Sequence, residues 1–241
     1  MSKTTIWNTL NRDSNIVRAK TVTCPNLKYS HKMVRLQYAR NHMSWTTEWK
    51  KVVFSDEKKF NLDGPDGYNG YWRDLRKDPL YFSKRNFGGG SLMIWGAFCS
   101  SGKLDLEFIS APLDSVTYQG VLRKQLVPFL KKFRRQDLLF QQDNATCHVS
   151  HSTTAFLDAN NIQVMKWPAC SPDVNPIENM WGIIVRSVYK DNRQYQTVTE
   201  LKCAILDAWH SISQETIDNL INSMPNRIFD IITNRGGHIN Y

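Results

Sequence analysis

The sequence lacks long apolar runs, clustered cysteines and a surplus of acidic residues. No stretch approaches the roughly 20 consecutive apolar residues that a transmembrane helix needs. The first residues, MSKTTIWNTLNRD, lack the apolar core of a secretory signal peptide. The five cysteines are scattered and form no CxxC pair, which favours a reducing compartment, cytosol or nucleus, over secretion.

Acidic residues are outnumbered. Lys and Arg total 31 against 22 Asp and Glu, which gives a formal net charge of +9. Such a surplus favours a polyanionic partner, with nucleic acid ahead of a membrane surface. Hydrophobic residues make up 41% of the 241, enough for one large domain with a sizeable core, or for one domain with a short appendage.

The N-terminal residues are predicted to form such an appendage. SKTTIWNTL, residues 2–10, has the spacing of a short helix with Ser2 as its cap. A basic linker over 11–28 and a second helix over 30–44 are expected to follow. In that second helix Met33, Leu36 and Tyr38 are predicted to face inward, and Lys32, Arg35 and Arg40 outward.

From residue 51 onward the pattern predicts strands joined by turns and then strands alternating with helices. The expected strands are 51–57, a second from 60 that continues past a Gly/Pro/Asp turn to 72, 92–98, about 106–109, 138–143 and 162–168. The expected helices are 117–136, 150–161, 178–190, 198–212 and 215–233. This order predicts an α/β fold with a mixed sheet covered by helices on both faces.

Two of the predicted strands end in an aspartate, Asp56 in KVVFSD and Asp143 in LLFQQD. A carboxylate at the mouth of a buried strand is unfavourable unless something compensates its charge. Each could simply cap a turn or pair with a basic residue. Glu57 adjoins Asp56, but side chains alternate along a strand, so the two should face apart. Asp56 is therefore the predicted site residue.

Glu178 follows the stiff turn SPDVNP at the start of a predicted helix. If Asn175 is the N-cap and Pro176 the first helical residue, Glu178 takes the third position, where a Glu can reach back to the N-cap amide. Helix capping and a chemical role are both open for this residue.

The three carboxylates can meet at one edge of the sheet if the two Asp-bearing strands are neighbours. Their mutual repulsion would raise their pKa values unless cations lie among them. Ligands that are all oxygen suit a hard ion such as Mg²⁺ or Mn²⁺. Two such ions about 3.5–4 Å apart can stabilise the attacking and leaving oxygens of a displacement at phosphorus.

These residues resemble the catalytic motifs of the Tc branch of the Tc/mariner cut-and-paste DNA transposases. The resemblance rests, in the same order, on FSDEKKF, GGGSLMIWGAF, QQDNATCH and WPACSPDVNPIENMWG, with 34 residues between the second Asp and the Glu. Mariner proper has Asp where this chain has Glu178. The resemblance implies an RNase H-like fold with a five-stranded mixed sheet. It also implies that Asp56, Asp143 and Glu178 are catalytic residues and ligands of Mg²⁺, for which Mn²⁺ can substitute, with two ions expected.

The resemblance also implies a reaction and its partners. Family members cut both strands at the ends of their own element with water as nucleophile, and the freed 3′-OH attacks target DNA at a TA dinucleotide. The expected partners are therefore double-stranded DNA of the inverted-repeat ends and of the TA target. A homodimer is expected because two element ends are handled together, and the nucleus is the expected location.

Within that family, full-length members carry two helix-turn-helix units that read the inverted repeats, and SKTTIWNTL resembles only the last helix of the second. Residues 1–45 are thus predicted to hold the end of this DNA-binding module, the basic linker and a helix, and 46–241 the catalytic domain. Binding to DNA is expected to run largely through phosphates and to depend steeply on salt.

Two further motifs leave alternatives open. The segment around Lys84, Arg85, Gly88, Gly89 and Gly90 is predicted to be a DNA-contacting loop, with a flexible hairpin turn as the alternative. No GK[ST] follows the glycines, so it is not a P-loop. The family often has a histidine downstream of the second Asp, so the resemblance implies DNA contact or support of a metal ligand for His148, with a plain position near a helix start as the alternative. A zinc site with Cys147 and His151 is disfavoured, because no second ligand pair stands at the usual spacing.

Two rivals to the transposase interpretation remain. A nuclease of the same fold would hydrolyse DNA without joining strands, and sequence spacing does not separate it from a transposase. A domesticated, non-catalytic DNA-binding descendant would not need the three acids, whose presence argues against it.

Overall fold

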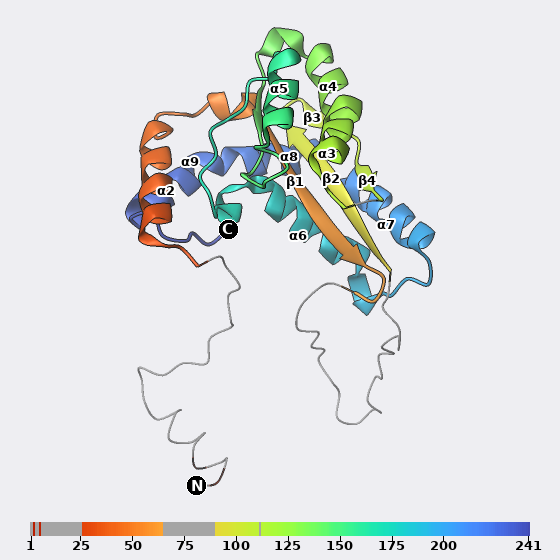
Figure 1. Ribbon diagram of the computed structural model, residues 1–241. Helices are drawn as coiled ribbons and strands as arrows, with labels where there is room; N and C mark the ends of the chain where they lie inside the picture. The colour runs from red at the N-terminus through yellow and green to blue at the C-terminus, as the bar shows by residue number, and fades with distance from the viewer. Residues whose placement is uncertain (1, 3–4, 6–25, 65–89, 111) are drawn as a thin grey trace.

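The computed structural model describes residues 2, 5, 26–64, 90–110 and 112–241 (Figure 1). Within them lies a five-stranded sheet in the order β3-β2-β1-β5, with β4 also paired to β2. β1 is antiparallel to β2 and parallel to β5, so the predicted mixed sheet is confirmed. The strands are β1 (Val52–Asn61), β2 (Ser91–Cys99), β3 (Gly102–Lys103), β4 (Glu107–Ile109) and β5 (Leu139–Gln141).

β1 takes in the strand expected over 51–57 and the start of the one expected from residue 60, whose continuation from 65 to 72 lies outside the described residues. β1 runs unbroken for ten residues, because its antiparallel pairing with β2 continues through the two lysines to Asn61. Asp56 was predicted to end a strand, but it lies in the middle of β1. The strand expected over 162–168 is reduced to one parallel bridge between Phe140 and Val164.

Helices cover both faces of the sheet, as the sequence predicts (Figure 1). Val53, Trp95 and Ala97 pack with side chains of α3, the following turn and α5, while Phe54, Ile94 and Phe98 belong to the larger core with α6 to α9. None of the described helices is long and apolar enough to span a membrane. The helices are α2 (Tyr29–Asn41), α3 (Ser115–Val121), α4 (Val127–Lys132), α5 (His151–Ala159), α6 (Pro176–Val188), α7 (Val198–Ser211), α8 (Gln214–Asn222) and α9 (Met224–Thr233).

Two of the predicted helices are interrupted. The one expected over 117–136 consists of α3, a π-helical turn over Leu122–Leu126, and α4. The one expected over 215–233 breaks at Ser223 into α8 and α9. Pro225 explains the second break, because proline lacks the N–H that a continuous helix would need at that position.

The orientation predicted for α2 is partly wrong. Tyr38 is buried as expected, but Arg35 is fully buried and Met33 is 44% exposed. Arg35 donates two hydrogen bonds of 2.7 Å to the carboxylate of Asp173 and one of 2.8 Å to Ser171 Oγ. Its guanidinium also donates to backbone carbonyls of the C-terminal segment. This complete set of partners is what makes burial of the charge tolerable.

Candidate active site

Asp56 is held by a tryptophan that fits only because a glycine lies opposite. On β2 the residue paired with Asp56 is Gly96, and Trp181 of α6 lies over it. A Cβ on Gly96 would come within 2.7 Å of the Trp181 ring. Trp181, itself fully buried, donates a 3.1 Å hydrogen bond from Nε1 to Oδ2 of Asp56. Sequence reasoning missed this pair; its one signal was the position of the glycine in the GGGSLMIWGAF motif.

Asp143 lies two residues beyond the end of β5. β1 and β5 are paired residue for residue in parallel, so extending that register brings Asp143 beside Asp56. Oδ1 of Asp143 accepts a 2.8 Å bond from the amide of Ala145 and lies 2.6 Å from Nδ1 of His148. The hydrogen bond from His148 lowers the pKa of Asp143 because it favours the charged carboxylate.

Glu178 is positioned by the N-cap of its helix. The side chain of Asn175 accepts a bond from the amide of Ile177 at 3.3 Å, and its Nδ2 donates to the carbonyl oxygen of Ser55 at 3.1 Å. The start of α6 is therefore bonded to β1 directly next to Asp56. The backbone N–H of Asn175 donates to the carbonyl of Pro172, so it is engaged without Glu178. Glu178 therefore does not cap its helix by accepting a hydrogen bond from the amide of Asn175.

The three acids form one electrostatic group. The pKa of Asp56 is raised well above its usual value, first by burial and then by the charges of Glu178, Glu57 and Asp143. Burial also raises the pKa of Glu178, and Lys58, whose Nζ lies 3.9 Å from its carboxylate, opposes that rise. The structure thus places Asp56 within electrostatic reach of the other two acids predicted from the sequence, and their charges disfavour its ionised form.

Within the described ranges, no three His, Cys, Asp or Glu side chains lie close enough together to hold a metal ion as they stand. The aspartates nevertheless offer oxygens to a cation. Trp181 occupies Oδ2 of Asp56, and Ala145 and His148 occupy Oδ1 of Asp143. No described side chain donates a hydrogen bond to Oδ1 of Asp56 or to Oδ2 of Asp143, although the backbone amide of Glu57 also favours the charged form of Asp56. Together with Glu178 they are an oxygen-only donor set, which fits a hard divalent cation.

Comparison with known proteins places this arrangement in a family. Residues 51–202 match the family model described as a DDE superfamily endonuclease. Over 240 residues the chain is 52% identical to the Tc3 transposase of Caenorhabditis elegans, and the match covers 100% of this chain and 72% of that protein. It is 31% identical over 231 residues to the Tcb2 transposase of Caenorhabditis briggsae, covering 93% and 83%. The chain belongs to the Tc/mariner family of cut-and-paste DNA transposases.

Solved transposase structures share its fold. The Mos1 transposase paired-end complex with the left transposon end superposes with a TM-score of 0.82 at 18% identity, covering 99% of this chain and 72% of that one. The catalytic domain of the Mos1 mariner transposase gives a TM-score of 0.70 at 16% identity, covering 91% and 100%. The predicted RNase H-like fold is confirmed.

His148 lies inside this transposase and not on its surface. Its side chain is 3% exposed, and its ring is 4.0 Å from that of Tyr118. Nδ1 faces Asp143, and Nε2 lies 3.4 Å from Oε1 of Glu57. Burial lowers the pKa of His148, but the two carboxylates outweigh it and raise the value to about 10. The direct DNA contact predicted for His148 does not fit this position, whereas support of a metal ligand does.

The predicted DNA-contacting loop lies mostly outside the described residues. That is the case for Lys84, Arg85, Gly88 and Gly89, so their role stays a prediction. Gly90 is described, and its carbonyl accepts a 3.0 Å bond from the amide of Leu62 at the base of the β1–β2 connection.

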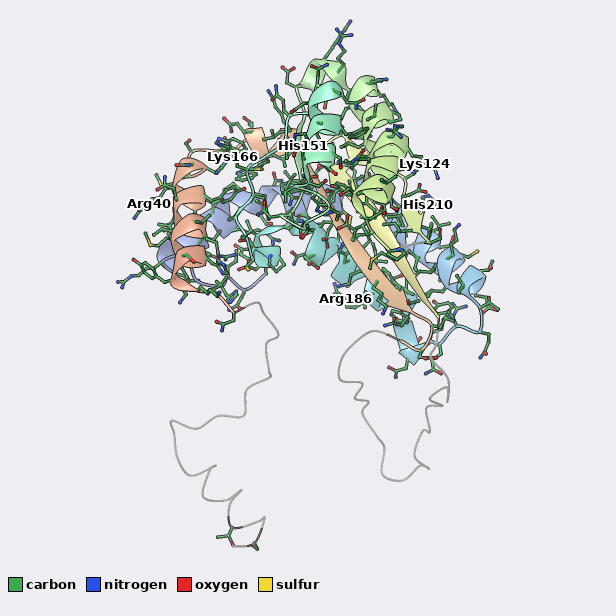
Figure 2. All side chains as sticks on the ribbon, viewed as in Figure 1. Arg40, Lys124, His151, Lys166, Arg186 and His210 are labelled. Carbon is green, nitrogen blue, oxygen red and sulfur yellow. The ribbon has the colours of Figure 1, made fainter. Side chains whose placement is uncertain are left out.

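Basic side chains on the transposase surface come from several elements. Figure 2 shows Arg40 on α2, Lys166 on the segment after α5, and Arg186 on α6, and all three residues are exposed. These exposed basic residues thus come from three separate elements, as suits contact with an extended polyanion.

Proposed function

We propose that this transposase cleaves double-stranded DNA at the inverted-repeat ends of its element and joins the freed 3′-OH to target DNA at TA. The observation that supports the proposal is the electrostatic environment of Asp56 on β1: burial and then the charges of Glu178, Glu57 and Asp143 raise its pKa, and the register of β1 with β5 points to Asp143 as its neighbour. Binding of DNA alone would not require three acids to be held against their repulsion.

Asp56, Asp143 and Glu178 would hold two divalent ions, Mg²⁺ with Mn²⁺ able to substitute. Bound there, the ions would polarise the scissile phosphate and activate the attacking water or 3′-OH. Trp181 and Ala145 each fix one oxygen of an aspartate and leave the other for the cation. The Mos1 paired-end complexes were solved with Mn and with Mg, which supports the same requirement in this chain.

The proposed partners are the inverted-repeat ends, the TA target and a second copy of the chain. The net charge of +9 and the Mos1 complexes with transposon ends support DNA as the partner. Residues 1–45 would contribute the last helix of the end-recognition module and a basic linker, ahead of the catalytic domain over 46–241. The nucleus is the proposed location, because the element's DNA is there.

A strand-transfer assay tests the proposal. The purified chain is mixed with Mg²⁺, a duplex carrying a pre-cut 3′-OH element end, and a plasmid target containing TA sites. Joined product is expected from the wild type and none from Asp56→Asn or Asp143→Asn. Hydrolysis of uncut ends without joining would favour the nuclease rival. Absence of both activities, with DNA binding retained, would favour the non-catalytic descendant.

A further inference from the structure

A buried line of side chains runs behind the second aspartate. Oε1 of Glu57 lies 3.4 Å from Nε2 of His148, and Nδ1 of the same ring lies 2.6 Å from Oδ1 of Asp143. Glu57 follows Asp56 on β1, so adjacent positions of one strand serve opposite faces of the sheet, as the alternation of side chains predicts. Asp56 faces the Trp181 side, and Glu57 faces the His148 side.

We propose that Glu57 is a positioning residue that acts through His148 to orient Asp143 for the cation. The proposal rests on the function proposed above. By fixing the His148 ring, Glu57 would hold Oδ1 of Asp143 against that ring and leave Oδ2 for the cation. Partners of this kind, behind the direct ligands, set the orientation of metal-binding groups in many proteins.

Burial and neighbouring contacts leave the His148 ring little freedom. Its ring centroid is 4.0 Å from that of Tyr118. Tyr118 donates a 2.7 Å hydrogen bond to Oε1 of Gln142, and Nε2 of Gln142 donates at 3.2 Å to the backbone carbonyl of His148. The ring is thus held from its face and its backbone, and Glu57 is left to determine where the ring edge points.

Among the described residues, Oε1 of Glu57 has no hydrogen-bond partner that would explain its position. The side chain is 14% exposed, and Oε1 lies 3.4 Å from Nε2 of His148, which is likewise buried without a hydrogen bond. A carboxylate in such a place is unfavourable unless a specific group compensates it. The two atoms are therefore paired through charge, and the line ends on a predicted metal ligand.

A Mn²⁺ titration of the full chain tests the proposal without any activity assay. The electron paramagnetic resonance signal of the free ion measures how much Mn²⁺ is bound. Glu57→Gln and His148→Gln are each expected to bind Mn²⁺ about tenfold more weakly than the wild type. If Glu57 acts through His148, the double variant should bind no more weakly than His148→Gln alone. Glu215→Gln, an exposed carboxylate on α8, is the matched control and should bind as the wild type does.

Three results would overturn the inference. One is wild-type affinity in Glu57→Gln. Another is a double variant whose loss equals the product of the two single losses. The third is failure of both single variants to fold in a thermal melt, which would assign the pair to stability and not to the ligand. If Asp56→Asn and Asp143→Asn bind Mn²⁺ as tightly as the wild type does, the proposed function is contradicted instead. The two failures are therefore distinguishable.

Discussion

Asp56 is a residue whose position is unfavourable for folding and suited to binding a cation. It lies half-buried in the middle of β1, where desolvation and then the charges of Glu178, Glu57 and Asp143 raise its pKa. A carboxyl group with a raised pKa in the folded state binds its proton more tightly there than in the unfolded chain. Stability of the metal-free protein therefore falls as the pH rises from the ordinary carboxyl pKa through the raised value.

Asp56→Asn should therefore stabilise the metal-free transposase at pH 7 while abolishing its activity. The amide oxygen can still accept the hydrogen bond from Trp181, but the repelled charge is gone. We expect a gain of about 1–2 kcal/mol, or a few degrees in Tm. Thermal melts in EDTA measure it, and the gain should shrink as the pH is lowered toward about 4. A variant less stable than the wild type at pH 7 would contradict this explanation.

Gly96→Ala tests the packing that orients Asp56. The new methyl group would meet the Trp181 ring at 2.7 Å, so the ring and its hydrogen bond to Asp56 must shift. We expect a loss of about 1–3 kcal/mol in stability and a clear fall in strand transfer. Gly120→Ala is the control, because a Cβ there meets nothing within 4 Å, and it should leave both unchanged or raise stability slightly. Equal behaviour of the two variants would count against a packing role for Gly96.

The identities of the three acids were predictable from the sequence, but their partners were not. Residue type and spacing indicated Asp56, Asp143 and Glu178, because oxygen ligands have a recognisable chemistry. Nothing local shows that Glu57 meets His148, since that contact depends on where α3 and β5 place the ring. Long-range pairing of this kind appears only when the strands and helices are assembled.

Among the elements, the turn before α6 is where the N-terminal helix meets the active site. Arg35 of α2 bonds Asp173 and Ser171 in this turn, and the same turn ends in Asn175, which ties α6 to β1. Arg227 of α9 donates to the carbonyl of Asp173 from the other side. Two buried guanidinium groups therefore fix the segment that aims Glu178.

Arg35→Met should destabilise the protein by about 3–5 kcal/mol, because it removes the guanidinium group from the largely buried carboxylate of Asp173 and leaves it only the amide of Ile239 and His238. Denaturant unfolding measures the change. Arg40→Met, on the exposed face of the same helix, should stay within about 0.5 kcal/mol of the wild type. Similar effects of the two substitutions would show that the Arg35 bonds contribute little.

Element types were predicted better than element ends or orientations. Hydrophobic spacing found the long helices, but it placed Arg35 outward because a charged residue on an amphipathic helix usually faces solvent. The spacing also missed the π-helical turn and the break at Ser223, because the period of the hydrophobic residues does not change at either place. The strand at 162–168 shrank to one bridge because sheet pairing, and not local sequence, decides its length.

At the scale of the whole molecule, charge governs the predicted contact with DNA. The net charge of +9 and the spread of exposed basic residues predict binding that is largely electrostatic. Affinity for a duplex without element sequence should fall by roughly tenfold or more between 50 and 200 mM salt, measured by fluorescence anisotropy. An affinity that barely changes over this range would contradict a phosphate-dominated interface.

The most direct test of the account is a crystal of the chain soaked in Mn²⁺, with anomalous scattering recorded for the metal. Density is predicted between Oδ1 of Asp56, Oδ2 of Asp143 and the carboxylate of Glu178, with Glu178 drawn away from Lys58. Well-ordered density elsewhere, or a crystal in which the three acids stay apart at saturating Mn²⁺, would contradict the claim that they form one cation site.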